Sequence, residues 1–532
     1  MLQQSWQAGQ RNTLTERLKS GNETWDVVIV GGGITGAGVA REAARRGLKT
    51  LLLERQDFAW GTSSRSSKMV HGGLRYIASG DIKTTMHSVK ERERLMKEAP
   101  GLVGQMSYMM THYQGNFPGP LAFNALLRVY DQFAGKRYRQ FHPKKDAQYF
   151  VPSAREDKMI GGTQFADAVT DDSRLVLRVM REAQQDGAEI INYVGVASLI
   201  KEGDKTVGVI AKDAITGDEY QVRADAVLNA TGAWADDLRG ELGHEKKIRP
   251  CRGSHIIVPK WRLPVAQALT VIHPDDSRPI FIFPWEGRTV IGTTDLDHPE
   301  LGNKEAAITR EEVDYLIKVV HDQFPKCELK EEDVISTFAG VRPLVSSGAL
   351  DPSKEKRDHT VWTDNGLVTV SGGKLTTFRL IALDVLKAAE PFIAKLDMSK
   401  KAGKKIFPKV DITSQAFKKL PSYVQKHLSG RYGRDADALV ECAQEGELEI
   451  IPGSQNIWAE VRWTARTEAI AHLDDLLLRR TRLGLLLPNG GLDFAEKIKS
   501  ICAQELSWDD ATWQQEVERY QGIIDQYYSL PA

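Results

Sequence analysis

Three glycines between two predicted strands constrain this chain more than any other feature. Val27 to Val30 and Leu48 to Leu53 are short apolar runs typical of buried strands. Between them, Gly31, Gly33 and Gly36 stand at G-x-G-x-x-G spacing. This spacing allows a sharp turn, a close approach of the backbone to a pyrophosphate, and tight packing of helix on strand. The sequence therefore predicts a Rossmann-like βαβ unit that binds a dinucleotide at the start of its helix.

An acidic residue and a hydroxyl-rich segment extend this prediction. Glu54 ends the second strand 18 residues after Gly36, where a carboxylate can accept hydrogen bonds from ribose hydroxyls. The segment that follows, 61–68, can wrap a pyrophosphate or the rim of a flavin with its hydroxyls and backbone N–H groups. Its candidate cofactor ligands are Thr62, Ser63, Ser67 and Lys68. The segment favours FAD over NAD.

Two further strand ends are marked by glycine. An apolar stretch runs into Asn229-Ala-Thr-Gly-Ala-Trp234, with Gly232 at the turn. Another, Leu367 to Val370, runs into a glycine turn that opens a helix, and Gly373, Leu375 and Thr376 are its candidate cofactor ligands. These distant segments predict one FAD gathered from several parts of the chain.

Eight sequence blocks resemble one family, the FAD-dependent glycerol-3-phosphate dehydrogenases of the amino-acid-oxidase-like flavoprotein group. In chain order they are GGGITGAGVA, TSSRSSKMVHGGLRY, TDDSRLVL, NATGAW, RGSHIIVP, IGTTDLD, AGVRPL and SGGKLTTFR, which together cover about residues 25 to 380. SSKMVHGGLRY and GGKLTT are far more specific than a glycine fingerprint. The resemblance implies oxidation of sn-glycerol 3-phosphate to dihydroxyacetone phosphate by hydride transfer from C2 to flavin N5.

A phosphorylated substrate needs fixed cations, and a guanidinium can hold phosphate with two parallel hydrogen bonds. The resemblance places a phosphate clamp at Arg342, Lys374 and Arg357, with Arg342 and Lys374 also part of the catalytic set. Tyr76 and its neighbour Arg75 are further candidate substrate contacts.

Two histidines compete for the role of the base. His255 in RGSHIIVP matches the active-site histidine of the family, and a neutral imidazole suits proton removal from a hydroxyl near neutral pH. His71 in KMVHGGLRY is expected on the flavin side of the site, where it would support the cofactor. The residues alone leave the choice between them open.

The expected fold is α/β, with a discontinuous FAD-binding domain, an antiparallel-sheet cap over the substrate, and a helical C-terminal domain. We assign residues 24–95, 150–248 and 338–392 to the FAD-binding domain and residues 96–149 and 249–337 to the cap. A lysine-rich linker, 393–409, then leads to helices over 410–532. Within the last region, Leu476 to Leu487 is expected to be a core helix whose arginines form ion pairs.

Composition narrows the choice of partners. Basic and acidic residues balance at 71 each, which argues against nucleic acid as a partner, and no apolar stretch is long enough to span a bilayer. The four cysteines are scattered, so neither a metal site nor an iron–sulfur relay is expected. Electrons should therefore leave the flavin directly, and the resemblance implies a membrane quinone as the acceptor, with oxygen as the alternative.

A quinone acceptor implies contact with a membrane. The basic and aromatic stretch 136–145 is a candidate surface for it, although a solvated loop would have the same composition. We expect a peripheral protein at the cytoplasmic, inner face of the cell membrane, and a homodimer. Two other functions stay open: a flavin oxidase of another small substrate, and a dinucleotide-binding sensor without activity.

Overall fold

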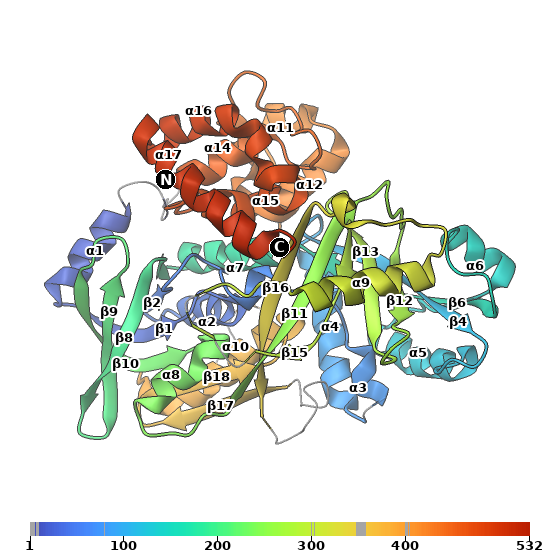
Figure 1. The fold of residues 1–532 in the computed structure, drawn as a ribbon. Coiled ribbons are helices and arrows are strands. Elements are labelled where there is room, and N and C mark those ends of the chain that lie inside the picture. Colours follow the sequence, from blue (N-terminus) through green and yellow to red (C-terminus); the bar gives the residue numbers. More distant parts are fainter. Residues whose placement is uncertain are drawn as a thin grey trace.

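The computed structural model describes residues 6, 10–78, 80–298, 301–302, 304–346, 358–399, 403 and 405–531. They form two β-sheets of eight and ten strands and a group of C-terminal helices that covers both (Figure 1). No helix within these ranges is long and apolar enough to cross a membrane.

The first sheet carries the predicted βαβ unit. Its strand order is β17-β18-β10-β1-β2-β7, and β1 pairs in parallel with both β2 and β10. Nearly every residue of β1 is buried, as expected for a central parallel strand covered on both faces. Helices α2, α7 and α10 cover one face, while α1 and the β8–β9 hairpin enclose a second apolar cluster on the other. The elements are β1 (Thr24–Val30), β2 (Thr50–Leu53), β7 (Glu189–Ile191), β8 (Val194–Glu202), β9 (Lys205–Asp213), β10 (Glu219–Asn229), β17 (His359–Asp364), β18 (Leu367–Gly372), α1 (Gln10–Ser20), α2 (Ile34–Ala44), α7 (Asp172–Gln185), α8 (Ala235–Gly240) and α10 (Phe378–Ala389).

The second sheet is the predicted cap. Its order is β15-β11-β14-β13-β12-β4-β6-β3, with β16 paired to β11 and β5 paired to β6. All pairs are antiparallel except β12 with β4. Its strands are β3 (Met69–Val70), β4 (Val103–Tyr113), β5 (Gln140–Pro143), β6 (Met159–Thr170), β11 (Ile248–Pro259), β12 (Ala268–Ile272), β13 (Pro279–Trp285), β14 (Arg288–Gly292), β15 (Leu296–Asp297) and β16 (Ser336–Val345). Its helices are α3 (Leu74–Ala78), α4 (Ile82–Glu98), α5 (Pro120–Ala134), α6 (Lys144–Phe150) and α9 (Arg310–Gln323).

The second sheet also takes strands from segments predicted for the FAD-binding domain. β3, β6 and β16 were assigned to the FAD-binding domain, yet all three pair within the second sheet. The physical reason is that β6 pairs with β4 along its whole length and β16 pairs with ten residues of β11, contacts between residues far apart in the sequence. The chain therefore crosses between the two sheets more often than its apolar pattern indicates.

The C-terminal helices share a core with the second sheet. Leu476, Leu477 and Leu485 are fully or almost fully buried in the same cluster as Phe283 and Val290 of the sheet. The prediction that Leu476 to Leu487 forms a buried element with ion-paired arginines is confirmed, although its first part is a π-helix, Asp475–Arg480. The helices are α11 (Gln415–Lys419), α12 (Ser422–Tyr432), α13 (Ala436–Glu441), α14 (Trp458–Thr467), α15 (Leu483–Leu486), α16 (Ala495–Leu506) and α17 (Asp510–Ile523).

Candidate functional site

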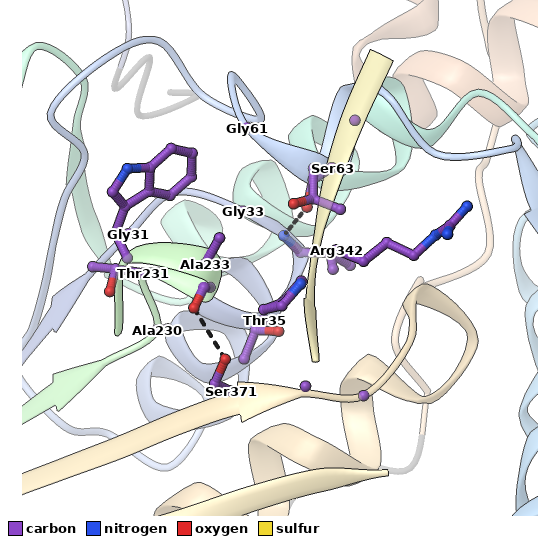
Figure 2. A pocket seen from close by; sticks show the side chains of 18 of the residues that line it. Gly31, Gly33, Thr35, Gly61, Ser63, Ala230, Thr231, Ala233, Arg342 and Ser371 are labelled. Carbon is purple, nitrogen blue, oxygen red and sulfur yellow. Dashed lines mark hydrogen bonds between the residues drawn. The ribbon is translucent and has the colours of Figure 1, made fainter. Parts of the chain in front are cut away.

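A cavity of about 550 Å³ runs between the two sheets and past the start of α2. Its walls come from the ends of β1, β2, β10 and β18, from the loop after β2, and from β11 and β16 of the cap. Figure 2 shows the glycine turn after β1, the turn after β10 and Arg342 of β16 around this space. Segments that are distant in the sequence thus meet at one elongated site.

The glycine turn leaves no room for side chains. Gly31 has φ +108, and a Cβ on it would lie 2.7 Å from the carbonyl oxygen of Ala230. A Cβ on Gly36 would lie 1.9 Å from the carbonyl oxygen of Gly31, so the first turn of α2 packs directly on the loop. Gly31 and Gly33 line the cavity, and Gly36 makes the close contact behind them. The backbone is therefore open to a ligand at the point where α2 begins.

Glu54 braces this turn from the second strand. Its Oε2 accepts a hydrogen bond from the backbone N–H of Gly32 at 2.5 Å, and its Oε1 accepts one from Gln56 at 2.8 Å. Burial raises the pKa of Glu54. Glu54 also lines the cavity, as the ribose role requires.

The loop after β2 contributes hydroxyls to the cavity wall. Ser63 accepts a hydrogen bond at 3.0 Å from the N–H of Ile34, the first residue of α2. The hydroxyl of Thr62 donates to the carbonyl oxygen of Val341 in β16. Both residues and Ser67 line the cavity.

The prediction that Lys68 contacts the cofactor is not supported by its position. Its side chain is completely buried, and Nζ donates to the carbonyl oxygen of Ser64 and to both carboxylate oxygens of Asp172. Lys68 is absent from the cavity wall, although both of its neighbours line it. Its ammonium is directed toward the buried carboxylate because burial without a counter-charge would be very costly.

The turns after β10 and β18 close the opposite wall. The hydroxyl of Ser371 donates to the carbonyl oxygen of Gly232 at 3.0 Å, which ties the two turns together (Figure 2). The hydroxyl of Thr376 donates to the carbonyl oxygen of His71 at 3.1 Å. The predicted ligands Gly232, His71, Gly373, Leu375 and Thr376 all line the cavity.

Two cationic side chains of the predicted clamp line the cavity, Arg342 from β16 and Lys374 from the turn after β18. Arg342 donates to Oδ1 of Asp295 at 2.7 Å and to the hydroxyl of Thr293 at 3.1 Å, which fixes the plane of its guanidinium group. Nζ of Lys374 lies 3.9 Å from the ring centroid of Tyr76. Arg342, Lys374 and Tyr76 all line the cavity, so the structure brings together three of the predicted substrate ligands.

Two predicted substrate ligands cannot be placed. Arg357 and the side chain of Arg75 lie outside the described residues. The sequence also missed one residue that orients the clamp, Asp295 in IGTTDLD, which pairs with both Arg342 and Arg278. Its position after a glycine-marked strand end is the only local sign of that role.

His255 is a buried histidine in the cavity wall. Its Nε2 lies 2.9 Å from Oγ of Ser67, and its ring stacks on Phe338 with centroids 4.4 Å apart and planes 7° apart. Burial, together with the charges of Lys68 and Arg342, holds the pKa of His255 well below its usual value. The imidazole is therefore neutral at neutral pH and able to accept a proton.

These features fit a bound FAD. A glycine cradle at the start of a helix accepts a pyrophosphate, and Glu54, Arg342 and Lys374 line the same cavity. Within the described ranges, no group of three or more His, Cys, Asp or Glu side chains is arranged to hold a metal ion.

Comparisons with known proteins agree with this geometry. The family described as FAD dependent oxidoreductase matches residues 26–379, and the C-terminal domain of alpha-glycerophosphate oxidase matches residues 395–513. The aerobic glycerol-3-phosphate dehydrogenase of Staphylococcus haemolyticus is 34% identical over 485 residues, which cover 86% of this chain and 87% of that protein. The protein of the same name from Staphylococcus aureus is 32% identical over 532 residues, covering 95% and 94% of the two chains.

A solved structure matches along nearly the whole length. The glycerol-3-phosphate dehydrogenase from Bacillus halodurans, complexed with FAD, superposes with a TM-score of 0.79 at 27% identity and covers 98% of each chain. The chain therefore belongs to the FAD-dependent glycerol-3-phosphate dehydrogenase family, within the FAD dependent oxidoreductases, and is an oxidoreductase with FAD as its cofactor.

Proposed function

We propose that this enzyme oxidises sn-glycerol 3-phosphate to dihydroxyacetone phosphate and passes the electrons to a membrane quinone. The observation that carries the proposal is that Arg342, Lys374 and the buried, neutral His255 all line one cavity. When bound, FAD supplies at N5 the acceptor for the hydride that leaves C2. The names of the relatives agree with this substrate.

The cations suit a substrate phosphate. Arg342 is held in one orientation by Asp295 and Thr293, so it can present its fork without losing much side-chain freedom on binding. Lys374 adds a second positive charge, and the hydroxyl of Tyr76 lies within the same wall. Arg357 and Arg75 remain predicted members of this clamp.

His255 is the proposed base. Its Nε2, next to Ser67 in the cavity wall, would take the proton of the C2 hydroxyl as the hydride departs. His71 also lines the cavity and is the alternative base. Single-turnover reduction under anaerobic conditions separates the two, because His255→Gln should slow reduction by roughly 10² to 10⁴ if His255 is the base. Wild-type reduction in His255→Gln would move the role to His71 or to water.

The substrate is tested by the colour of the purified protein. A yellow enzyme should bleach when glycerol 3-phosphate is added without oxygen, and should keep its colour with glycerol or glycine. Bleaching by glycine would instead indicate an amino-acid oxidase. Bleaching by none of the three would leave the sensor function as the better proposal.

The acceptor and the membrane contact are tested together. Hydrophobic side chains are exposed in the segments that precede and follow the basic stretch 136–145 along the chain: Phe117 is 84% exposed, Leu121 88% and Tyr149 78%. They lie on or beside α5 and α6, which pack on β5 and β6, and they support peripheral contact with the inner face of the cell membrane. Reoxidation by a quinone analogue should be faster than by oxygen, and vesicles with anionic lipid should retain the enzyme at moderate salt. Faster reoxidation by oxygen would favour an oxidase, and light scattering would test the proposed homodimer.

A further inference from the structure

Lys68 is a buried charged residue that the proposed reaction does not use. It directly follows Ser67, and its backbone is in the left-handed region with φ +57. Nζ lies 2.9 Å from Oδ1 and 3.0 Å from Oδ2 of Asp172, and 2.5 Å from the carbonyl oxygen of Ser64. All three hydrogens of the ammonium group therefore have acceptors, and the side chain is held in one place.

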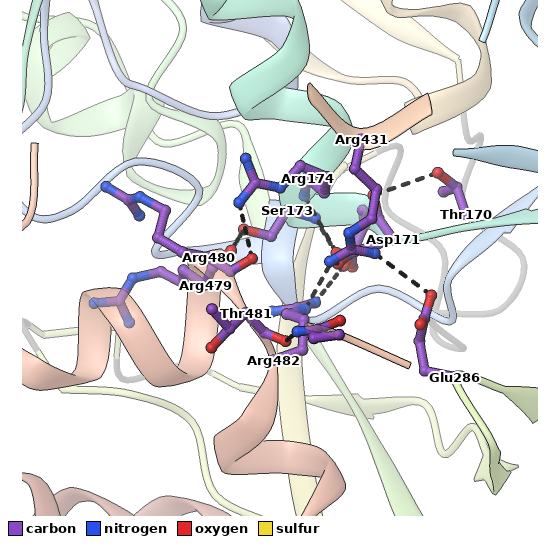
Figure 3. A network of polar contacts seen from close by, with 12 residues as sticks. Thr170, Asp171, Ser173, Arg174, Glu286, Arg431, Arg479, Arg480, Thr481 and Arg482 are labelled. Atoms are coloured by element: carbon purple, nitrogen blue, oxygen red, sulfur yellow. Dashed lines mark hydrogen bonds and ion pairs between the residues drawn. The ribbon is translucent and has the colours of Figure 1, made fainter. Parts of the chain in front are cut away.

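The C-terminal helices hold the other side of this ion pair. Arg482 donates to Oδ1 of Asp172 at 2.5 Å and to the carbonyl oxygen of Ser64 at 2.8 Å. Figure 3 shows Arg482 beside Asp171, which pairs with Arg431 at 2.8 Å. Asp172 also accepts hydrogen bonds from the N–H and the hydroxyl of Ser66. The loop that carries Ser66, Ser67 and Lys68 is thus anchored to a distant part of the chain.

The anchored lysine lies close to the proposed base. Nζ of Lys68 is 4.5 Å from the ring centroid of Phe338, and the same ring stacks on His255 at 4.4 Å. Ser67, one residue before Lys68, makes the hydrogen bond to Nε2 of His255. Lys68 and His255 thus contact the same ring, that of Phe338, and Ser67, which precedes Lys68, contacts His255 directly.

The charges that act on His255 are of one sign. Lys68, from the loop before β3, and Arg342, from β16, both lower the pKa of the imidazole. The charged groups around Lys68 itself are Arg482, Asp172 and Asp171, and burial together with Arg482 lowers its pKa to about 7. At the acidic pH where a histidine would begin to protonate, Lys68 is therefore still a cation.

We propose that Lys68 is a positioning residue that keeps His255 a neutral proton acceptor and holds Ser67 against it, and that Asp172 at the start of α7 and Arg482 of the C-terminal helices fix Lys68 for this purpose. The inference deepens the proposed function and rests on it, because His255 is the base only there. It assigns the C-terminal helices a part in the chemistry of a site to which they contribute no lining residue.

The test compares Lys68→Gln with Lys68→Arg in the holoenzyme. Glutamine keeps a donor for Asp172 and removes the charge, whereas arginine keeps the charge. Histidine Cε1–H resonances are followed by NMR from about pH 3.5 to pH 8, a range that extends well below the ordinary histidine pKa, and the resonance missing in His255→Gln identifies His255. In Lys68→Gln the titration midpoint of His255 should rise by about one pH unit, the size of effect that one nearby buried charge exerts. The pH midpoint of the acid limb in the rate of anaerobic flavin bleaching should rise by the same amount. Lys68→Arg should return both midpoints to the wild-type values.

Arg174→Met is the matched control. Arg174 is equally buried and pairs with Glu468 of the C-terminal region at 2.6 Å, yet its ion pair does not involve Asp172. This variant should lower the melting temperature and leave the titration of His255 unchanged.

Two outcomes would overturn the inference: a wild-type midpoint of His255 in folded Lys68→Gln, or an equal shift in Arg174→Met. If neither lysine variant folds, a wild-type His255 resonance that titrates near its ordinary pKa overturns it as well. Failure of the proposed base is recognised separately, because His255→Gln would then bleach at the wild-type rate at every pH.

Discussion

Replacing Gly36 by alanine should detach FAD while leaving most of the fold in place. The new Cβ would lie 1.9 Å from the carbonyl oxygen of Gly31 and 3.1 Å from its carbonyl carbon. An ordinary contact between heavy atoms is about 3.5 Å, so the turn and the helix must separate by roughly 1.5 Å. Gly31 itself packs on Ala230, so the strain falls on the turn that lines the cavity.

An overpacked site of this kind costs about 3 kcal/mol. If the cost falls on the cofactor-binding conformation, the Kd for FAD should rise by about a hundredfold. The assay is titration of the apoprotein with FAD, followed by flavin fluorescence, with far-ultraviolet circular dichroism as the measure of folding. A wild-type Kd in a folded Gly36→Ala protein would refute the close-packing explanation of the glycine pattern.

Gly522→Ala supplies the matched control. Gly522 lies in the exposed part of α17, and a Cβ there would meet no heavy atom within 4 Å. Alanine favours helix over glycine by about 0.8–1 kcal/mol, so this variant should raise the melting temperature slightly and bind FAD normally. The same glycine-to-alanine change is thus expected to weaken FAD binding at position 36 and to stabilise the helix without affecting FAD binding at position 522.

Three further predictions follow from the ion pairs and the buried histidine. Arg342→Ala should raise the KM for glycerol 3-phosphate by at least about 30-fold, since a desolvated charge pair contributes about 2–5 kcal/mol; an unchanged KM would remove Arg342 from the clamp. Asp57→Asn should lower the melting temperature strongly, because Asp57 is the buried counter-charge of Arg479 and Arg480 and breaking such a pair costs about 3–5 kcal/mol. Because the pKa of His255 is lowered on folding, the folded protein binds fewer protons than the unfolded chain below the ordinary histidine value of 6.5, and stability falls as pH falls. His255→Gln removes this pH-dependent loss of stability. Acidification from pH 7.5 to pH 5.5 should therefore destabilise the variant less than the wild type, by about 1.4 kcal/mol, as measured by melting temperature. Equal decreases of the melting temperature in the two proteins would contradict the lowered pKa.

Local features were predictable because their requirements are local. The turn at Gly31 needs a positive φ and the contact at Gly36 needs a missing side chain, and both appear directly as glycine in the sequence. The acid at Glu54 follows from the length of one βαβ unit, because the strand ends beside the turn that it braces. The turns that carry Gly232 and Gly373, which the sequence predicts to bind the cofactor, both line the cavity.

Other features depend on contacts across the sequence and could not be predicted. The strand pattern of β6 and β16 is the same in either sheet, and only their partners β4 and β11 decide where they belong. The segment of Asp295 shows only a glycine-marked strand end, which does not identify Arg342, 47 residues further along the chain, as the partner of Asp295.

The sequence by itself determined the glycine turn beside the cavity, FAD as the cofactor and the family, because glycine turns and a few specific motifs express their chemistry over short stretches. Tertiary structure alone decided the direction of Lys68. In sequence it is one more polar residue in a loop expected to wrap the flavin, but a buried ammonium must lie against its counter-charge. That counter-charge is Asp172, which is shared with Arg482, 414 residues away from Lys68 along the chain.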